Sequence, residues 1–432
     1  MNTYILQGAL AAIACVPALV LGCAGDDGSD SGDDSGESWG TELRGSIEED
    51  TVWSEDTILG GVVTVKNGAV LTVEPGVVVL GKTGSALVIA KGSRLEAIGS
   101  REEPIVFTSS QAEGSRARGD WGGIVLLGDA ATNLVGGIGI AEGLEDQPNY
   151  GGGENPKLDG SCGSLSYVRI EFAGYELTTD NELNGLTLYA CGSGTRVDHV
   201  QVHMGEDDGI EMFGGSWSGS HIVISGAGDD SIDIDQGWSG QLQYVVIVQD
   251  PGTGNFAFEI SNQEANRDAE PRTMPRIANV TAIGGGGSKS GGIKLKEGAA
   301  GQFFNVIVTG FNNAAVELTE VQTEAQAEAE AIVLEGSLFF NNARGGGDVY
   351  VTSEGSSWDL GAFVVAGKDN LFDLDPLLSS TDWQGLNIVP DPASPVLSGI
   401  AVPMDFAEAD YIGAVGSSDS DWTQGWTSFV PY

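Results

Sequence analysis

Carboxylates in the middle of the chain occur in pairs, and the pairs repeat. Asp207 and Asp208 are followed 22 residues later by Asp229 and Asp230. Two carboxyl groups that flank a glycosidic bond supply the acid and the base or nucleophile of glycoside hydrolysis. Carboxylate oxygens are also the ligands that Ca²⁺ prefers. The same residues therefore offer two chemistries, and the elements that position them decide which one is available.

A second set of residues repeats in phase with these pairs, and each member stands between two apolar residues. Segments such as Gly209-Ile210-Glu211-Met212 and Ser231-Ile232-Asp233-Ile234 show the pattern. Alternation of apolar and polar residues is typical of β-strands, and self-similarity at a period of twenty-odd residues is typical of a solenoid. The central residues, spaced by 24, 22, 26, 35 and 23 positions, are Thr187, Glu211, Asp233, Glu259, Lys294 and Glu317.

These repeats predict an all-β fold, a right-handed parallel β-helix over residues 39–345. A coil of 22 to 26 residues with two or three short strands can hydrogen-bond to the next coil, and the 66 glycines suit the corners between strands. Residues 323–331, rich in Ala and Glu, are expected to form a helix that leaves a coil at a turn. A β-sandwich is the alternative, but sandwiches do not repeat one charged column coil after coil.

The period is lost after Gly345, where Pro and Trp accumulate. A solenoid exposes its end strands unless something covers them. Residues 346–432 are therefore predicted to form the last irregular coil and a C-terminal cap, in which Trp422 and Trp426 pack.

In a parallel β-helix, residues in phase lie about 4.8 Å apart on successive coils. Asp207 would then lie under Asp229, and Asp208 under Asp230. Like charges at that spacing repel by about 3.5 kcal/mol at an effective dielectric of 20. One hypothesis is that Ca²⁺ relieves this repulsion, and the alternative is a fully solvated column that needs no specific ion. The candidate metal ligands are Asp208, Glu211, Asp230, Asp233, Asp235 and Glu259.

Catalysis on a polysaccharide is the competing hypothesis for this region. The segments Asn-Thr-Asp and Gly-His-Gly, which accompany the paired aspartates of polygalacturonases, do not occur in the sequence. Lys294, the candidate base of a lyase, lies three coils from Glu211, roughly 14 Å away. The candidate catalytic residues are Asp207, Asp208, Asp229, Asp230 and Lys294.

Aromatic and imidazole side chains lie near the charged column. Phe213, Trp217 and Trp238 could stack on sugar rings as ligand-binding residues, or they could pack the loops between coils. His199 and His203 would lie about 13 Å apart on an extended strand, too far to share a metal. We expect these two histidines and His221 to be ordinary surface residues.

The N-terminus predicts export and lipid anchoring. An apolar run ends in Val20-Leu21-Gly22-Cys23, which resembles a bacterial lipobox, although no Lys or Arg precedes the run. Residues 1–22 are thus the expected signal peptide and Cys23 the expected lipidation site, with an uncleaved membrane helix as the alternative. Residues 23–38, rich in Gly, Ser and Asp, would form an extended tether. By resemblance to lipoprotein sorting rules, Ala24 after the cysteine favours the outer membrane over the inner one.

Composition restricts the partners and the redox state. With 19 Lys and Arg against 62 Asp and Glu, the formal net charge is −43, so nucleic acid is a poor partner. Cys162 and Cys191 remain after the signal and the anchor are set aside, and an exported protein would join them in a disulfide. Each opens a Cys-Gly-Ser turn before an apolar strand, at Val168 and Val197, with the same offset of 29.

Several segments together carry a resemblance to a known family. They are Gly119-Asp120-Trp121-Gly122-Gly123, Tyr167–Gly174, Asp207–Glu211, Asp235-Gln236-Gly237 and Trp422–Thr427. They resemble a family of acidic β-helical surface lipoproteins of Gram-negative bacteria, and the fold is also distantly similar to that of pectate lyases and polygalacturonases. The resemblance supports the fold and the location and leaves the function open. The competing hypotheses are a rigid surface module that binds a glycan or a partner protein without catalysis, a cation-loaded structural module, and a carbohydrate-active enzyme.

Overall fold

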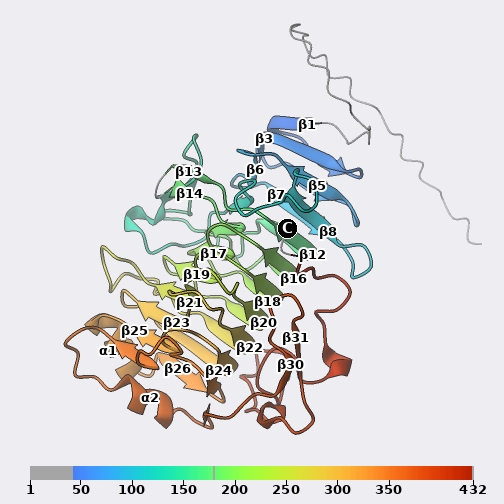
Figure 1. Ribbon diagram of the computed structural model, residues 1–432. Coiled ribbons are helices and arrows are strands. Elements are labelled where there is room, and N and C mark those ends of the chain that lie inside the picture. Colours follow the sequence, from blue (N-terminus) through green and yellow to red (C-terminus); the bar gives the residue numbers. More distant parts are fainter. Residues whose placement is uncertain (1–41, 179–180, 431–432) are drawn as a thin grey trace, which may run out of the picture. The chain divides into compact units, whose positions relative to one another are not determined.

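The computed structural model describes residues 42–178 and 181–430 (Figure 1). The predicted signal peptide (residues 1–22), the lipidation site Cys23 and the tether (residues 23–38) lie outside these residues. Among the described helices, none is long and apolar enough to cross a membrane.

Parallel strands stacked coil on coil form a β-helix, as predicted (Figure 1). The first face carries one ladder of parallel strands, which β1 (Glu42–Ile47) extends at its N-terminal end by pairing with β3. Its other strands are β3 (Thr57–Val65), β6 (Ala86–Ile89), β9 (Ile124–Leu127), β15 (Leu186–Tyr189), β17 (Ile210–Phe213), β19 (Ile232–Asp235), β21 (Phe256–Ser261), β23 (Gly291–Lys296), β25 (Val316–Leu318) and β28 (Tyr350–Thr352).

Longer strands form the second and third faces, because each one bends at a residue with positive φ. His199 has φ 53° and His221 has φ 56°, and the same position in the two later coils is taken by Asn279 and Asn305. The long strands are β12 (Gly163–Glu171), β16 (Arg196–His203), β18 (Ser218–Ser225), β20 (Gln241–Val248), β22 (Arg276–Ile283) and β24 (Gly301–Thr309).

Shorter strands extend these faces toward both ends of the stack. Toward the N-terminus lie β1 (Glu42–Ile47), β2 (Thr51–Trp53), β4 (Val70–Val73), β5 (Val78–Gly81), β7 (Arg94–Ile98) and β8 (Ile105–Ser109). Toward the last coil lie β26 (Ile332–Glu335), β27 (Leu338–Phe340) and β29 (Leu371–Phe372). Three antiparallel pairs stand outside the coils: β10 (Gly139–Ile140) with β11 (Asn149–Tyr150), β13 (Glu176–Thr178) with β14 (Asn181–Glu182), and β30 (Leu378–Ser380) with β31 (Asn387–Pro390).

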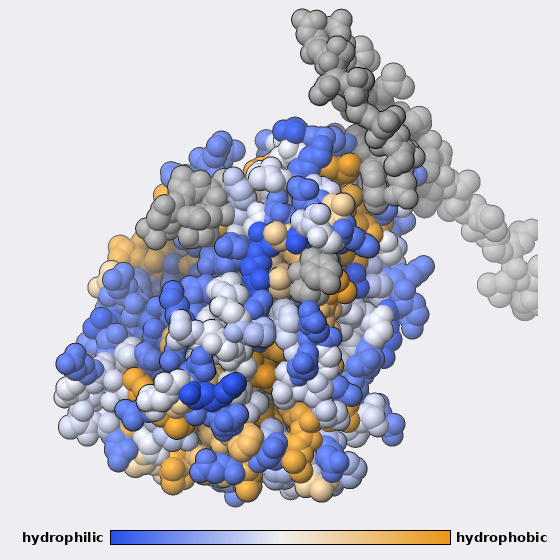
Figure 2. Space-filling view, viewed as in Figure 1, coloured by the Kyte–Doolittle hydropathy of each residue, from blue (hydrophilic) through white to orange (hydrophobic). Residues whose placement is uncertain are grey.

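Apolar side chains from all three faces fill the interior. The residues that flank the charged column stack in register, so Ile210 lies under Ile232 and Ile232 under Phe258, each fully buried. The predicted helical excursion is α1 (Val321–Glu328). The face seen in Figure 2 is mostly hydrophilic with small apolar patches, which fits the large excess of Asp and Glu.

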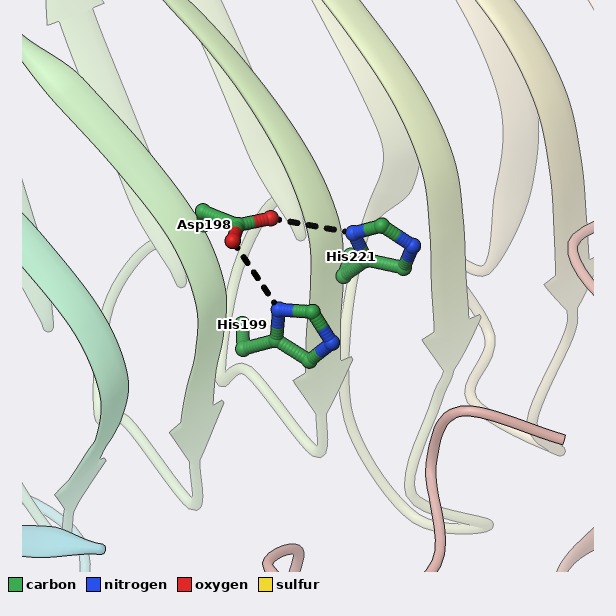
Figure 3. A group of neighbouring side chains, drawn as sticks. All are labelled: Asp198, His199 and His221. Atoms are coloured by element: carbon green, nitrogen blue, oxygen red, sulfur yellow. Dashed lines mark hydrogen bonds and ion pairs between the residues drawn. The ribbon is translucent and has the colours of Figure 1, made fainter. Parts of the chain in front are cut away.

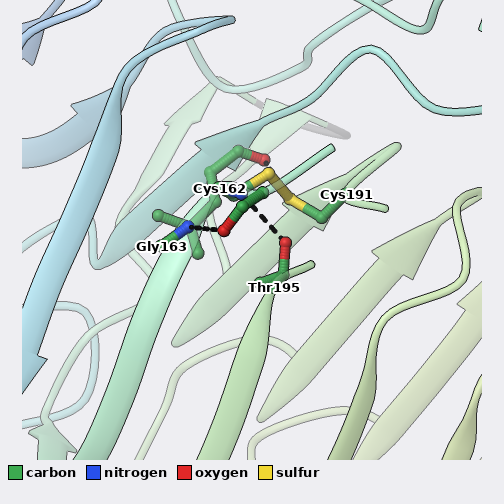
Figure 4. The surroundings of a disulfide bond; sticks show 6 residues. Cys162, Gly163, Cys191 and Thr195 are labelled. Carbon is green, nitrogen blue, oxygen red and sulfur yellow. Dashed lines mark hydrogen bonds between the residues drawn. A yellow bond between two sulfur atoms is a disulfide. The ribbon is translucent and has the colours of Figure 1, made fainter. Parts of the chain in front are cut away.

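The predicted disulfide is present, with Cα atoms of Cys162 and Cys191 5.8 Å apart (Figure 4). The alignment that predicted it is wrong, because Val197 pairs with Leu165 and Val168 pairs with Val200. The cysteines therefore do not occupy equivalent positions. Cys191 follows β15 on the first face, whereas Cys162 precedes β12, and the bond ties the two faces together.

The C-terminal region does not form a cap alone. Helix α2 (Leu360–Ala366) closes the last coil, where Leu360 and Val364 join the main apolar core. Residues 375–430, here called the strap, then run back along the long strands (red in Figure 1). The strap meets Asn305 at Ile400, Gln243 at Ala407 and Gln201 at Ser428. As the strap proceeds from residue 400 to residue 428, it contacts progressively earlier coils. It therefore runs back along the stack and covers a lateral face.

Candidate functional site

The charged column lies on the first face in the predicted register. Glu211 pairs with Asp233, Asp233 with Glu259, Glu259 with Lys294, and Lys294 with Glu317. The column is therefore a line of side chains from β17, β19, β21, β23 and β25. The six predicted metal ligands (Asp208, Glu211, Asp230, Asp233, Asp235 and Glu259) are called the carboxylate column below.

Asp208 and Asp230 stand just before these strands and form a ladder from side chain to backbone. Asp208 Oδ1 accepts a hydrogen bond of 2.8 Å from the backbone N–H of Asp230, and Asn184 Oδ1 accepts one of 3.2 Å from Asp208. Asp230 Oδ1 accepts from the N–H of Phe256. One oxygen of each aspartate thus accepts a hydrogen bond from the backbone of the next coil. These bonds hold the two carboxyl groups beside Glu211 and Asp233.

The carboxylate column is buried or half-buried. The exposed fractions of Asp208, Asp230 and Glu259 are only 7%, 4% and 8%. Part of the cover comes from the segment 129–157, which has no periodic pattern. Its Tyr150 hydroxyl donates to Gln236 Oε1 at 2.7 Å, and Asn133 N–H donates to the Gln236 carbonyl at 3.0 Å. A fully solvated column is therefore wrong for these residues.

Burial sets the electrostatics of the carboxylate column. It raises the pKa of Asp208, Glu211, Asp230 and Asp233 well above the ordinary range, and the charges of neighbouring carboxylates add to the effect. Burial also raises the pKa of Asp235 to about 7. An unpaired buried carboxylate costs several kcal/mol, so it must take up a proton or a cation.

Two of the three overlapping carboxylate groups in the described part of the chain share Asp233 and differ in how they are neutralised. Asp230, Asp233 and Glu259 form one group, and Lys294 Nζ lies 3.1 Å from Glu259 Oε1, with Lys296 on the other oxygen. Burial raises the pKa of Glu259, but the two ammonium groups outweigh it and lower the pKa. The other group is Asp208, Glu211 and Asp233, called the triad below. Its hydrogen-bond partners are uncharged, and the charge of Lys296 offsets only part of the raised pKa of Asp233.

One carboxylate oxygen of the triad is unpaired. Asp233 Oδ1 is buried and has no hydrogen-bond partner. One ligand oxygen from each triad residue lies within 4.8 Å of the other two. Three oxygens bound to one Ca²⁺ at about 2.3–2.6 Å lie up to roughly 4.5 Å apart when the ion is in their plane, so the triad oxygens are at this spacing or within a few tenths of an ångström of it. The triad therefore has the donor type and spacing of a calcium site.

Phe213, Trp217 and Trp238 are too buried to stack on sugar rings, so that interpretation of them is wrong. Trp217 and Trp238 are fully buried within the coils, and Phe213 stacks on Tyr189 with ring centroids 4.6 Å apart. They pack the loops between coils, which was the alternative interpretation, because the turns after β17 and β19 fold inward.

The predicted catalytic residues are not gathered at one open site. Asp208 and Asp230 are buried, whereas Asp207 and Asp229 are half-buried. Lys294 lies three coils from Glu211, as predicted, and forms ion pairs with Glu259 and Glu317. Burial therefore weighs against a substrate reaching the aspartates of the ladder.

The histidines are not ordinary surface residues. His203 is 1% exposed, and its Nε2 lies 2.7 Å from the carbonyl oxygen of Val430 in the strap. His199 and His221 face a common carboxylate, that of Asp198, which immediately precedes His199 in β16 (Figure 3). The sequence did not predict this cluster because β16 bends at His199, whereas a regular extended strand was expected.

A family model described as a pectate-lyase like beta helix domain matches residues 45–358. No curated protein and no solved structure matches the chain.

Proposed function

Because this chain belongs to the pectate-lyase-like β-helix domain family, we propose that it is an exported, lipid-anchored β-helical binding module that Ca²⁺ stabilises. The calcium ion would be held by the triad of Asp208, Glu211 and Asp233. The anchor would be acylated Cys23, and residues 23–38 would hold the body away from the outer membrane. In this proposal the body binds ligands and does not transform them.

The buried Oδ1 of Asp233 carries the calcium part of the proposal. It has no hydrogen-bond partner and stands between two other carboxylates whose pKa values burial raises. Calcium supplies the charge that Lys294 and Lys296 supply to Glu259 one coil further along. Ca²⁺ accepts six to eight oxygen ligands, so backbone carbonyls and water would complete its coordination.

A cleft between the strap and the coil edge supports the binding part. The cleft has a volume of about 750 Å³, within the range of ligand sites. Its polar and aromatic lining residues include Gln249, Arg344, Asp375, Asp382, Trp383 and Gln384. The exposed amide, guanidinium and carboxylate groups of Gln384, Arg344, Asp375 and Asp382 are the chemistry that hydrogen-bonds to sugar hydroxyls, while Trp383 is buried and stacks on His203. We therefore propose a glycan as the ligand, with a partner protein as the alternative.

A carbohydrate-active enzyme is the second candidate, because the family description refers to pectate lyase. Burial of Asp208 and Asp230 and the pairing of Lys294 with Glu259 argue against these residues as its acid and base. A glycan array probed with the soluble body, residues 39–432, separates the two candidates. Reproducible hits without chain cleavage support the binding module, and cleavage of a bound glycan would establish the enzyme.

The calcium proposal is tested by thermal unfolding of the same body in calcium and in chelator, at constant ionic strength. Wild-type protein should melt higher in sub-millimolar calcium. Asp233→Asn should lose the calcium response and, in chelator, should melt higher than wild type, because it removes a buried repelling charge. The double variant Asp208→Asn with Asp230→Asn should also lose the response, while each Asn keeps its Oδ1 as the backbone acceptor.

Glu317→Gln is the matched control. It removes a carboxylate from the same line of strands, two coils beyond Glu259, where Lys294 is the ion-pair partner. Its calcium response should equal that of wild type. If sodium chloride alone raised the midpoint as much as calcium did, the column would be merely screened and the calcium site rejected.

A further inference from the structure

Asp198, His199 and His221 form a second cluster of metal-ligating side chains, on a different face from the carboxylate column (Figure 3). Asp198 and His199 lie in β16, and His221 lies in β18. Both histidines have positive φ, at the bend where the long strands pass from the second face to the third. The bend turns both imidazoles to the same side and stacks them on successive coils.

The donor atoms of the cluster gather around the carboxylate of Asp198. His199 Nδ1 lies 3.1 Å from Asp198 Oδ2, and His221 Nδ1 lies 3.0 Å from Asp198 Oδ1. The hydroxyl of Ser220 donates to Asp198 Oδ1 at 2.7 Å and so orients the carboxylate. His199 Nδ1 is buried and makes no hydrogen bond of acceptable geometry, even to Asp198. Two nitrogens and a carboxylate thus face one another, and one nitrogen is unsatisfied.

Aromatic residues enclose the cluster. The ring of His199 stacks between those of Tyr167 and His221, with centroids 4.2 Å away on both sides, and His221 stacks on Tyr244 at 5.0 Å. The strap adds Trp422, whose ring meets His221 edge-on at 5.0 Å. This dry surrounding strengthens electrostatic attraction to a cation.

One side of the cluster remains accessible. A cavity of about 280 Å³ lies between β16, β18, β20 and the strap, and Asp198 and Ser220 line it together with Gln243, Asp405 and Phe406. Water and ions can therefore approach the carboxylate from this side. Burial raises the pKa of Asp198, but the neighbouring imidazoles of His199 and His221 and the hydroxyl of Ser220 outweigh burial and hold it well below its usual range. The carboxylate is consequently charged at neutral pH.

We propose that His199 Nδ1, His221 Nδ1 and the Asp198 carboxylate bind a divalent transition-metal ion, Zn²⁺, with water from the cavity as the fourth ligand. Zn²⁺ takes imidazole and carboxylate ligands at about 2.0–2.2 Å in tetrahedral geometry, which separates neighbouring ligand atoms by roughly 3.3 Å. The observed 3.0 and 3.1 Å are close to this separation. Imidazole nitrogens suit Zn²⁺, whereas the all-oxygen triad suits Ca²⁺, so the two sites select different metals.

Zinc binding requires two local changes. Each imidazole must carry its proton on Nε2, which frees Nδ1 to coordinate. The two rings, now 14° from parallel, must also tilt toward a common point, because lone pairs of stacked rings run nearly parallel. The tilt alters the contact with the edge of Trp422, so it provides a fluorescence signal.

The test is a Zn²⁺ titration of the full-length chain in detergent, stripped of metal and then saturated with Ca²⁺ to occupy the triad. Wild type should bind one more Zn²⁺ per chain than His199→Asn with His221→Asn, and its tryptophan fluorescence should change with that binding. Each single histidine variant should bind at least about 100-fold more weakly, since loss of an outer-shell partner alone costs 10- to 100-fold. Substituted Co²⁺ should give the visible absorption of a tetrahedral site.

Asn is the appropriate replacement because Asn279 and Asn305 occupy the same bend in later coils, with φ of 54° and 56°. The variants should therefore fold. Glu317→Gln, which removes a carboxylate on the first face and leaves the histidine cluster and its aromatic neighbours intact, is the control and should leave zinc affinity unchanged. Equal zinc binding by wild type and the double histidine variant would overturn the proposal. It does not rest on the calcium site, since Asp233→Asn should bind this Zn²⁺ normally.

Discussion

Loss of the Cys162–Cys191 disulfide should destabilise the body by about 3.6 kcal/mol. The bond closes a loop with a sequence separation of 29. The chain-entropy relation then gives about 12 cal/mol/K of denatured-state entropy that the bond removes, or about 3.6 kcal/mol at 25 °C. For a body of nearly 400 residues, whose unfolding entropy is about 0.8 kcal/mol/K, this corresponds to a fall of about 4 °C in the midpoint.

The assay compares thermal unfolding with and without a reductant, after a thiol assay has established complete reduction. Reductant should lower the midpoint of wild type by about 4 °C. The variant Cys162→Ala with Cys191→Ala is the matched control, because reductant has no bond to break in it and should leave its midpoint unchanged. A wild-type midpoint that stays the same after full reduction would refute the loop-closure reasoning.

Three further predictions concern the strap, the carboxylate column and the anchor. Trp426 is 1% exposed, so Trp426→Ala should cost about 3–5 kcal/mol in thermal unfolding, and an unchanged midpoint would contradict strap packing. Burial raises the pKa of Asp235 to about 7, so in chelator its contribution to stability is complete below about pH 4 and is lost as pH rises through 7. Asp235→Asn should flatten this fall of the midpoint between pH 5 and 8; an equal slope would exclude Asp235 as its source. Cys23→Ala should abolish fatty-acid labelling and signal cleavage, and a variant labelled and cleaved as wild type would reject the lipobox.

The register of the charged column was predictable from sequence because two independent signals agreed. Apolar residues on both sides of Glu211, Asp233 and Glu259 require these side chains to point away from the core. The period of 22 to 26 residues then sets which of them lie on neighbouring coils. The structure confirms each of these pairings.

The histidine cluster was not predicted because a residue with positive φ interrupts the alternation of side chains along a strand. If side chains are assigned to alternate faces in steps of two from Val200, His199 and Asp198 are therefore assigned the wrong orientation. A signal was nevertheless present: the residue before the apolar pair of each long strand is Tyr, His, His, Tyr, Asn and Asn at 167, 199, 221, 244, 279 and 305. Asn tolerates the left-handed region, so its recurrence at one phase could have indicated a bend.

The burial of the column and the path of the strap could not be derived from periodicity. The segment 129–157 and the strap have no repeat, and their contacts join residues far apart in the chain, such as Gln201 and Ser428 with a separation of 227. Nothing local in the sequence specifies such contacts. Trp422 and Trp426 do pack, as predicted, but against the lateral face and not at an end.

The strap also determines how the molecule comes apart. Coils that touch only their neighbours can fray one at a time, as in other solenoids. Here a single segment is bonded to side chains from successive coils, through Asn305, Asn279, Gln243 and Gln201. Releasing any one coil strains bonds to the others, so unfolding becomes collective. A chain cut short before residue 400 would lack these bonds and would remain a row of separable coils.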